Sequence, residues 1–188
     1  MSRAHPGARV DAWAVDEHRL GLLPVVRRVW APKGRRPTAP VRRRYAWPYV
    51  YGFARPSTGQ TWWCLLPAVG LEAFGLALAA FARDEGVGTG KRAVLALDNA
   101  GWHTSPKLDV PEGVHLAFLP AYSPELQPAE RLWGPIDEPV ANRSFASLDD
   151  LEDALADRCR GLERQRRMLR SRCRYHWWPR ERRPRNPK

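Results

Sequence analysis

The sequence predicts an α/β domain built on a sheet with buried central strands. Residues 94–97 and 114–119 are short, unbroken apolar runs of the kind that form strands covered on both faces. Residues 71–85 instead repeat large apolar side chains such as Phe74 and Phe81 at helical spacing. A chain of 188 residues is long enough for one domain with a sizeable core.

The first strand is expected over residues 11–22, with Asp16 near its middle. A carboxylate within a core strand must be compensated, because an unpaired charge is costly to bury. An edge-strand ion pair of Asp16 or Glu17 with Arg19 is one explanation, and a functional site is the other. Since side chains alternate along a strand, Glu17 should point to the face opposite Asp16, which makes it the weaker site residue.

Residues 27–44 hold eight basic residues and no acidic one. Within them, Val29 and Trp30 predict a second strand, which Pro32 and Gly34 would turn. A solvated loop is the alternative, but we favour contact with the DNA backbone, since guanidinium groups match phosphate geometry. The expected DNA-binding residues are Arg27, Arg28, Lys33, Arg35, Arg36, Arg42, Arg43 and Arg44.

A hairpin and a helix follow. Residues 49–54 and 61–66 are rich in aromatic and β-branched side chains and flank a turn-forming segment, which predicts two paired strands. Their aromatic residues, including Trp62 and Trp63, are expected to pack in the sheet. The helix over residues 71–85 should then end at Gly86, since glycine favours the conformation of a C-terminal cap.

Two further acids lie at the ends of expected elements. Asp98 directly follows the strand at 94–97, before a turn formed by residues 99–101. Pro128 suits the first position of a helix, which places Glu130 in the first helical turn. Each acid also has an ordinary explanation, because aspartate stabilises turns and glutamate complements the helix dipole.

The C-terminal part is expected to be helical and then disordered. Leu132 and Trp133 should be core residues, and the Gly134–Pro135 pair should stop or kink their helix. Ser147 and Asp150 form an N-terminal capping pattern for a last amphipathic helix that runs to about Gly161 or beyond.

Positive charge is concentrated at the C-terminus. The net charge is +11, and residues 158–188 contain 13 basic and 2 acidic residues, so the remainder is balanced. Such a tail is either a solvated segment or a phosphate-binding one. We expect an N-terminal extension over residues 1–10, a folded domain over 11–170, and a basic, disordered tail over 171–188.

Several protein classes are disfavoured. No apolar run approaches the roughly 18 residues that span a bilayer, and the first ten residues lack a signal-peptide core. The three cysteines are widely spaced and form no metal motif, which indicates a reducing, cytoplasmic location.

Two strings identify a family. L-D-N-A-G-W-H and F-L-P-A-Y-S-P-E-L-Q-P-A-E-R-L-W resemble the catalytic core of DDE transposases, and within them the mariner-type transposases of bacterial insertion sequences. V-D-E at 15–17, R-R-V-W-A-P at 27–32 and Y-H-W-W-P-R at 175–180 are also similar to family segments. The likeness covers about residues 12–180. One departure is Gln127, where the family usually has asparagine.

The resemblance implies an RNase H-like mixed sheet with flanking helices, in which three antiparallel strands precede parallel ones. It assigns Asp16, Asp98 and Glu130 as the catalytic acids and as ligands of Mg²⁺, for which Mn²⁺ can substitute. Asp16 and Asp98 would lie on adjacent central strands. Two ions roughly 4 Å apart would then promote phosphodiester cleavage at element ends and attack of the freed 3′-OH on target DNA.

Other functions are kept open. A transposase remnant could bind nucleic acid without cutting it, and an RNase H-like nuclease could act on branched or hybrid substrates. His103 could orient the site or only pack in its turn, while His18 and His115 are expected to be structural.

DNA is the expected partner, near the nucleoid, and a homodimer is possible. About ten residues precede the first strand, too few for a helix-turn-helix, so we expect an upstream-encoded helix-turn-helix protein or domain to read element ends. This chain alone should bind DNA with little sequence preference.

Overall fold

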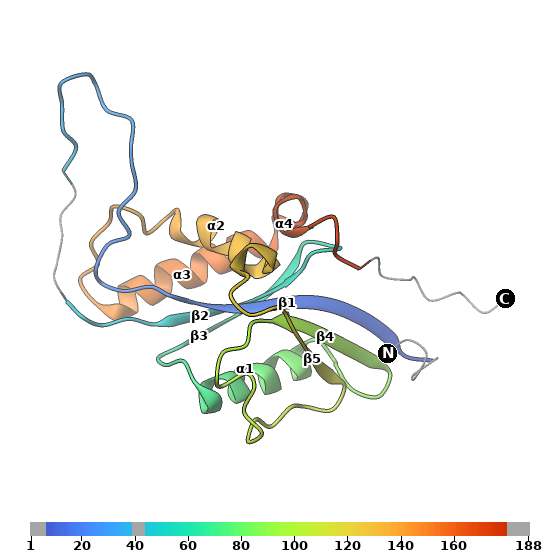
Figure 1. Cartoon of the computed structure of the whole chain (residues 1–188). Coiled ribbons are helices and arrows are strands. Elements are labelled where there is room, and N and C mark those ends of the chain that lie inside the picture. Colours follow the sequence, from blue (N-terminus) through green and yellow to red (C-terminus); the bar gives the residue numbers. More distant parts are fainter. Residues whose placement is uncertain (1–6, 39–43, 180–188) are drawn as a thin grey trace.

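The computed structural model describes residues 7–38 and 44–179 and shows an α/β domain of three layers (Figure 1). A five-stranded sheet in the order β3-β2-β1-β4-β5 forms the middle layer. Helix α1 covers one face, and α2, α3 and α4 cover the other (Figure 1). No helix in the described ranges is long and apolar enough to cross a bilayer.

The sheet is mixed, as expected. Its strands are β1 (Arg9–Arg19), β2 (Tyr49–Arg55), β3 (Gln60–Leu66), β4 (Lys91–Leu97) and β5 (Val114–Phe118). β1, β2 and β3 are antiparallel neighbours, whereas β4 runs parallel to both β1 and β5. The predicted hairpin and the adjacency of the strands that carry Asp16 and precede Asp98 are therefore confirmed.

The helices are α1 (Leu71–Asp84), α2 (Trp133–Asp137), α3 (Leu148–Glu163) and α4 (Arg166–Cys173), with 3-10 turns η1 (Pro124–Leu126) and η2 (Pro128–Leu132). α1 and α3 begin close to the expected residues. The helix expected from Pro128 is instead a 3-10 turn up to Leu132, and α4 was not predicted as a separate helix. Gly86 follows α1 with a φ of 62°, a left-handed conformation suited to glycine. Ser147 and Asp150 form the predicted capping box of α3.

Alternation along β1 decides what each face of the sheet presents. The sheet has a core on each face. Trp13 and Val15 are buried in the core on the α1 side, while Ala14 is buried in the second core, beneath α2, α3 and α4. Asp16 therefore faces the second core and Glu17 faces the α1 side, as the period of two predicts.

The predicted strand at Val29 and Trp30 is wrong. The chain from residue 20 to 38 is an extended loop that projects away from the sheet (Figure 1), and it contains no strand. The side chains of Val29 and Trp30 are 55% and 103% exposed. Strand-forming residues stabilise a strand only when a neighbouring strand pairs and buries them, and neither condition is met here.

The Gly134–Pro135 pair does not stop its helix. The chain changes from the 3-10 turn η2 to the α-helix α2 at Trp133, so Pro135 falls in the first turn of α2. Backbone N–H groups in a first turn have no intrahelical partner, and the missing N–H of proline costs nothing there.

The expected disorder from residue 171 is wrong for residues 171–179. α4 extends to Cys173, and both Cys173 and Trp178 are buried in the core beneath α2 and α3. Arginines surround Cys173 and Trp178 in the sequence, and the high positive charge of the segment therefore favoured disorder over burial. Residues 180–188, for which disorder was also expected, lie outside the described residues.

Candidate active site

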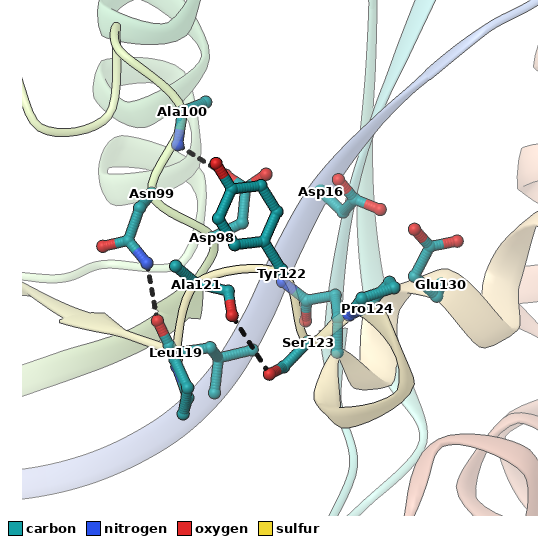
Figure 2. Close-up of a pocket in the computed structure, with 12 residues that line it drawn as sticks. Asp16, Asp98, Asn99, Ala100, Leu119, Ala121, Tyr122, Ser123, Pro124 and Glu130 are labelled. Carbon is teal, nitrogen blue, oxygen red and sulfur yellow. Dashed lines mark hydrogen bonds between the residues drawn. The ribbon is translucent and has the colours of Figure 1, made fainter.

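A pocket of about 380 Å³ opens where β1, β4 and η2 meet. Asp16, Asp98 and Glu130 all line it, together with the loop over residues 119–124 (Figure 2). In Figure 2, Asp16 and Glu130 lie next to each other, and Asp98 lies on the Asn99–Ala100 side of the pocket. The structure thus brings the three predicted acids to one cavity, although 32 residues separate the last two in sequence (130 − 98).

Asp16 lies partly buried on the floor of the pocket. The indole Nε1–H of Trp133 donates a hydrogen bond of 3.0 Å to its Oδ2. Burial raises the pKa of Asp16 to about 7; the Trp133 hydrogen bond opposes this rise, and the charges of Glu130 and Glu17 add to it. A carboxylate in these surroundings is stabilised by a proton or by a cation.

Gly52 makes room for Trp133. It is the register partner of Asp16 on β2, and a Cβ atom there would lie 2.8 Å from Cη2 of Trp133. The ring of His18 also stacks on the indole of Trp133, at a centroid distance of 4.9 Å. His18 also contacts Asp137 at 2.8 Å, so the structural role predicted for it fits its surroundings.

Asp98 follows β4 and remains 61% exposed. Its Oδ1 accepts a hydrogen bond of 3.1 Å from the backbone N–H of Ala100, which is the turn contact expected for aspartate at this position. The same oxygen lies 2.7 Å from Nδ1 of His103. Among the described residues, both contacts use Oδ1, so Oδ2 is available to a ligand in the pocket.

Glu130 is exposed on η2, and Gln127 fixes this turn to β1. The Gln127 side chain is buried, donates a 3.0 Å hydrogen bond to the carbonyl of Val15 and accepts one of 3.3 Å from the N–H of Ala129. The residue that departs from the family pattern therefore caps the 3-10 turn. This role was not predicted from the sequence, because glutamine is not among the residues that usually cap a helix N-terminus.

His103 contacts both Asp98 in the pocket and Glu17 on the α1 side of the sheet. Its ring is 1% exposed and packs against Phe74 at a centroid distance of 4.3 Å. While Nδ1 contacts Asp98, Nε2 lies 3.0 Å from Oε1 of Glu17, which is itself only 7% exposed. Burial lowers the pKa of His103, but the hydrogen bonds and charges of Glu17 and Asp98 outweigh burial and raise it. No pattern in the sequence indicates that Glu17 and His103 touch.

Residues 11–152 match the family model of the DDE superfamily endonucleases. The chain belongs to this family. An uncharacterized protein of Sinorhizobium fredii, y4pE/y4sA, is 42% identical over 106 residues, which cover 56% of this chain and 77% of that protein.

Solved structures of the Mos1 mariner transposase share the fold. Its strand transfer complex aligns with a TM-score of 0.55 at 18% identity, over 93% of this chain and 58% of that one. Its isolated catalytic domain aligns with a TM-score of 0.55 at 16% identity, over 86% and 78%. The RNase H-like fold is thereby confirmed. This endonuclease domain spans just over half the length of the Mos1 chain in the strand transfer complex.

The donor chemistry of this DDE endonuclease site fits a hard divalent cation. Carboxylate oxygens are the ligands that Mg²⁺ takes, and burial together with the charges of Glu130 and Glu17 raises the pKa of Asp16, an effect that a bound cation would offset. Within residues 7–38 and 44–179, however, no group of three or more His, Cys, Asp or Glu side chains is arranged to hold a metal ion as it stands. The pocket supplies the right atoms in an open arrangement.

The predicted DNA-binding residues divide into two groups. Arg27 is paired with Asp137 at 3.1 Å, and Arg44 donates to the carbonyl of Ala146 at 3.2 Å, so both brace the loop against the helical layer. The second group, Arg28, Lys33, Arg35 and Arg36, is exposed along the loop, and Arg44 is exposed as well. Arg42 and Arg43 lie outside the described residues.

Proposed function

We propose that this chain is the catalytic domain of an insertion-sequence transposase, which cuts DNA phosphodiesters at element ends and joins the 3′-OH to target DNA. The observation that carries the proposal is the meeting of Asp16, Asp98 and Glu130 in one pocket. Membership of the DDE endonuclease family supports the nuclease chemistry. The likeness to Mos1 complexes, including paired-end complexes solved with Mn and with Mg, supports the fold and the choice of cation.

Each acid has a distinct part. Asp16, Asp98 and Glu130 would hold Mg²⁺ or Mn²⁺, which when bound activates the attacking oxygen and stabilises the leaving oxygen of the phosphodiester. Trp133 keeps Asp16 directed at the pocket, and Gln127 holds the turn that carries Glu130. No side chain has to become a covalent nucleophile.

DNA would be held beside the pocket by exposed arginines. Arg28, Arg35 and Arg36 extend from the loop after β1, and α4, which packs against η2, is rich in exposed arginines. Such contacts hold phosphates without reading sequence. Recognition of element ends by an upstream-encoded helix-turn-helix domain, and a homodimer, belong to this proposal as further expectations.

Nicking of supercoiled plasmid in Mg²⁺ or Mn²⁺ tests the proposal, with Asp98→Asn as the test variant. Wild type should nick DNA, and the variant should lose at least about a thousandfold in rate, because ligand loss removes several kcal/mol of transition-state stabilisation. Asp109→Asn, an exposed acid outside the pocket, is the matched control.

The competing function is a remnant that only binds nucleic acid. DNA binding by folded wild type without nicking in either metal would favour that remnant over the transposase. Equal nicking by wild type and Asp98→Asn would contradict the assigned acids.

A further inference from the structure

We propose that His103 and Glu17 are positioning residues that hold the carboxylate of Asp98 in its metal-binding orientation, acting from the α1 side of the sheet. The inference rests on the proposed function, because it takes Asp98 as a cation ligand. It assigns a role in the site to Glu17, which lies on the face of β1 opposite Asp16 and does not line the pocket.

The turn after β4 brings the His103 ring under Asp98. The backbone N–H groups of His103 and Thr104 both donate to the carbonyl of Ala100, at 2.9 and 3.2 Å, which closes this turn. The Ala100 N–H in turn donates to Oδ1 of Asp98. Oδ1 is therefore held by one backbone donor and by Nδ1 of His103, and rotation of the carboxylate would break both contacts.

Glu17 fixes the other end of the ring. Both ring nitrogens face carboxylate oxygens, at 2.7 Å for Asp98 and 3.0 Å for Glu17. A carboxylate oxygen only accepts, so this geometry is satisfied when both nitrogens carry hydrogen and donate. In the described residues, His103 is the ion-pair partner of Glu17, and neither lysine nor arginine pairs with it.

Packing alone does not account for this arrangement. If the His103 ring only filled the space beside Phe74, an apolar side chain could do the same. The carboxylate of Glu17 would then not have to be buried beside it, and burying a carboxylate costs free energy. The free-energy cost of burying the His103–Glu17 pair is explained if the pair holds the carboxylate of Asp98 in its orientation. Groups that hydrogen-bond a metal ligand typically change metal affinity or activity by about 10- to 100-fold when removed.

Two substitutions of His103 separate its two contacts. The amide nitrogen of asparagine occupies about the place of Nδ1, and that of glutamine the place of Nε2. His103→Asn therefore keeps a donor for Asp98, whereas His103→Gln keeps a donor for Glu17 only. The readouts are Mn²⁺ affinity of the DNA-free protein, by titration calorimetry, and the metal concentration that gives half-maximal nicking.

His103→Gln should weaken Mn²⁺ binding by about 10- to 100-fold and raise the half-maximal metal concentration in parallel. His103→Asn should remain closer to wild type in both measurements. Glu17→Gln, which leaves the Asp98 contact in place, should fall between them. His176→Gln, on an exposed histidine that does not line the pocket, is the matched control and should bind Mn²⁺ as wild type does.

Equal Mn²⁺ affinity in wild type and folded His103→Gln would overturn the inference and leave the proposed function intact. If thermal unfolding shows that His103→Gln does not fold, Glu17→Gln decides, and unchanged affinity in it has the same meaning. Absence of both Mn²⁺ binding and nicking in wild type would instead overturn the proposed function, and this inference with it.

Discussion

Strand β1 carries two acids whose surroundings are opposite in charge. Asp11 is completely buried, and its carboxylate lies 2.6 Å from Arg55, 2.9 Å from Arg9 and 3.6 Å from Lys91. Asp16, five residues further on, has a neutral indole donor instead, and its charged neighbours are acids.

The difference separates a carboxylate that the protein itself compensates from one that it leaves uncompensated. The protein supplies the cations for Asp11, so that acid is compensated as soon as the chain folds. In the described ranges no ion pair compensates Asp16 or Glu130, which leaves the pocket in need of positive charge. Two acids on one strand therefore make opposite contributions to the free energy of unfolding, and substitutions should show it.

The largest effect is expected for Asp16→Asn on activity. Nicking should fall by at least about a thousandfold, because the change removes one of the three proposed metal ligands. The folded fraction should nevertheless not decrease, since the change removes a carboxylate that burial disfavours. Plasmid nicking and urea unfolding of the same preparation provide the check; loss of both activity and stability would make Asp16 a structural acid like Asp11.

Asp11→Asn should reduce the free energy of unfolding by about 3–5 kcal/mol, because it removes the carboxylate charge that pairs with the buried guanidinium of Arg55 at 2.6 Å. Urea denaturation measures the loss. Nicking per folded molecule should remain near the wild-type value, since Asp11 does not line the pocket. A loss of activity in fully folded protein would remove the distinction between the two acids.

The pH dependence of stability should isolate Asp16. Its pKa is raised from 3.8 to about 7 on folding, so the folded state binds the proton more tightly than the unfolded state. Stability without metal should therefore fall between pH 4 and pH 7, by on the order of 2 kcal/mol more in wild type than in Asp16→Asn. Unfolding curves in EDTA at several pH values test this. Mg²⁺ should restore the loss at pH 7, and parallel curves for the two proteins would contradict the prediction.

The smallest effect concerns α4. Removal of residues 164–188 would also remove the buried Leu169, so exposed arginines should be neutralised instead. Arg167→Gln with Arg170→Gln should flatten the slope of log affinity against log salt by about 0.9 for each phosphate that the variant no longer neutralises. Arg83→Gln on α1, across the sheet, is the control. An unchanged slope would mean that α4 does not touch phosphate.

The sequence was sufficient where one local rule decides the outcome. Side-chain alternation placed Asp16 and Glu17 on opposite faces, and Pro128 marked the start of the turn that carries Glu130. The family strings supplied the grouping of the three acids, which spacing alone could not give.

The sequence was insufficient where the outcome depends on contacts between distant segments. Glu17 and His103 meet because the turn after β4 returns beneath β1, and no periodicity encodes that contact. Trp30 has strand propensity but no neighbouring strand to pair with, and Trp178 finds a core position within a basic segment.

Gly52 sets a limit on how this domain could be engineered. Replacing a strand glycine with alanine is a common way to raise thermal stability, because it restricts the unfolded chain. At Gly52 the added methyl group would meet the rings of Trp133 and Trp63 at 2.8 and 3.0 Å. The displaced indole would release Asp16, so a sequence optimised only for heat resistance would lose the geometry of its own active site.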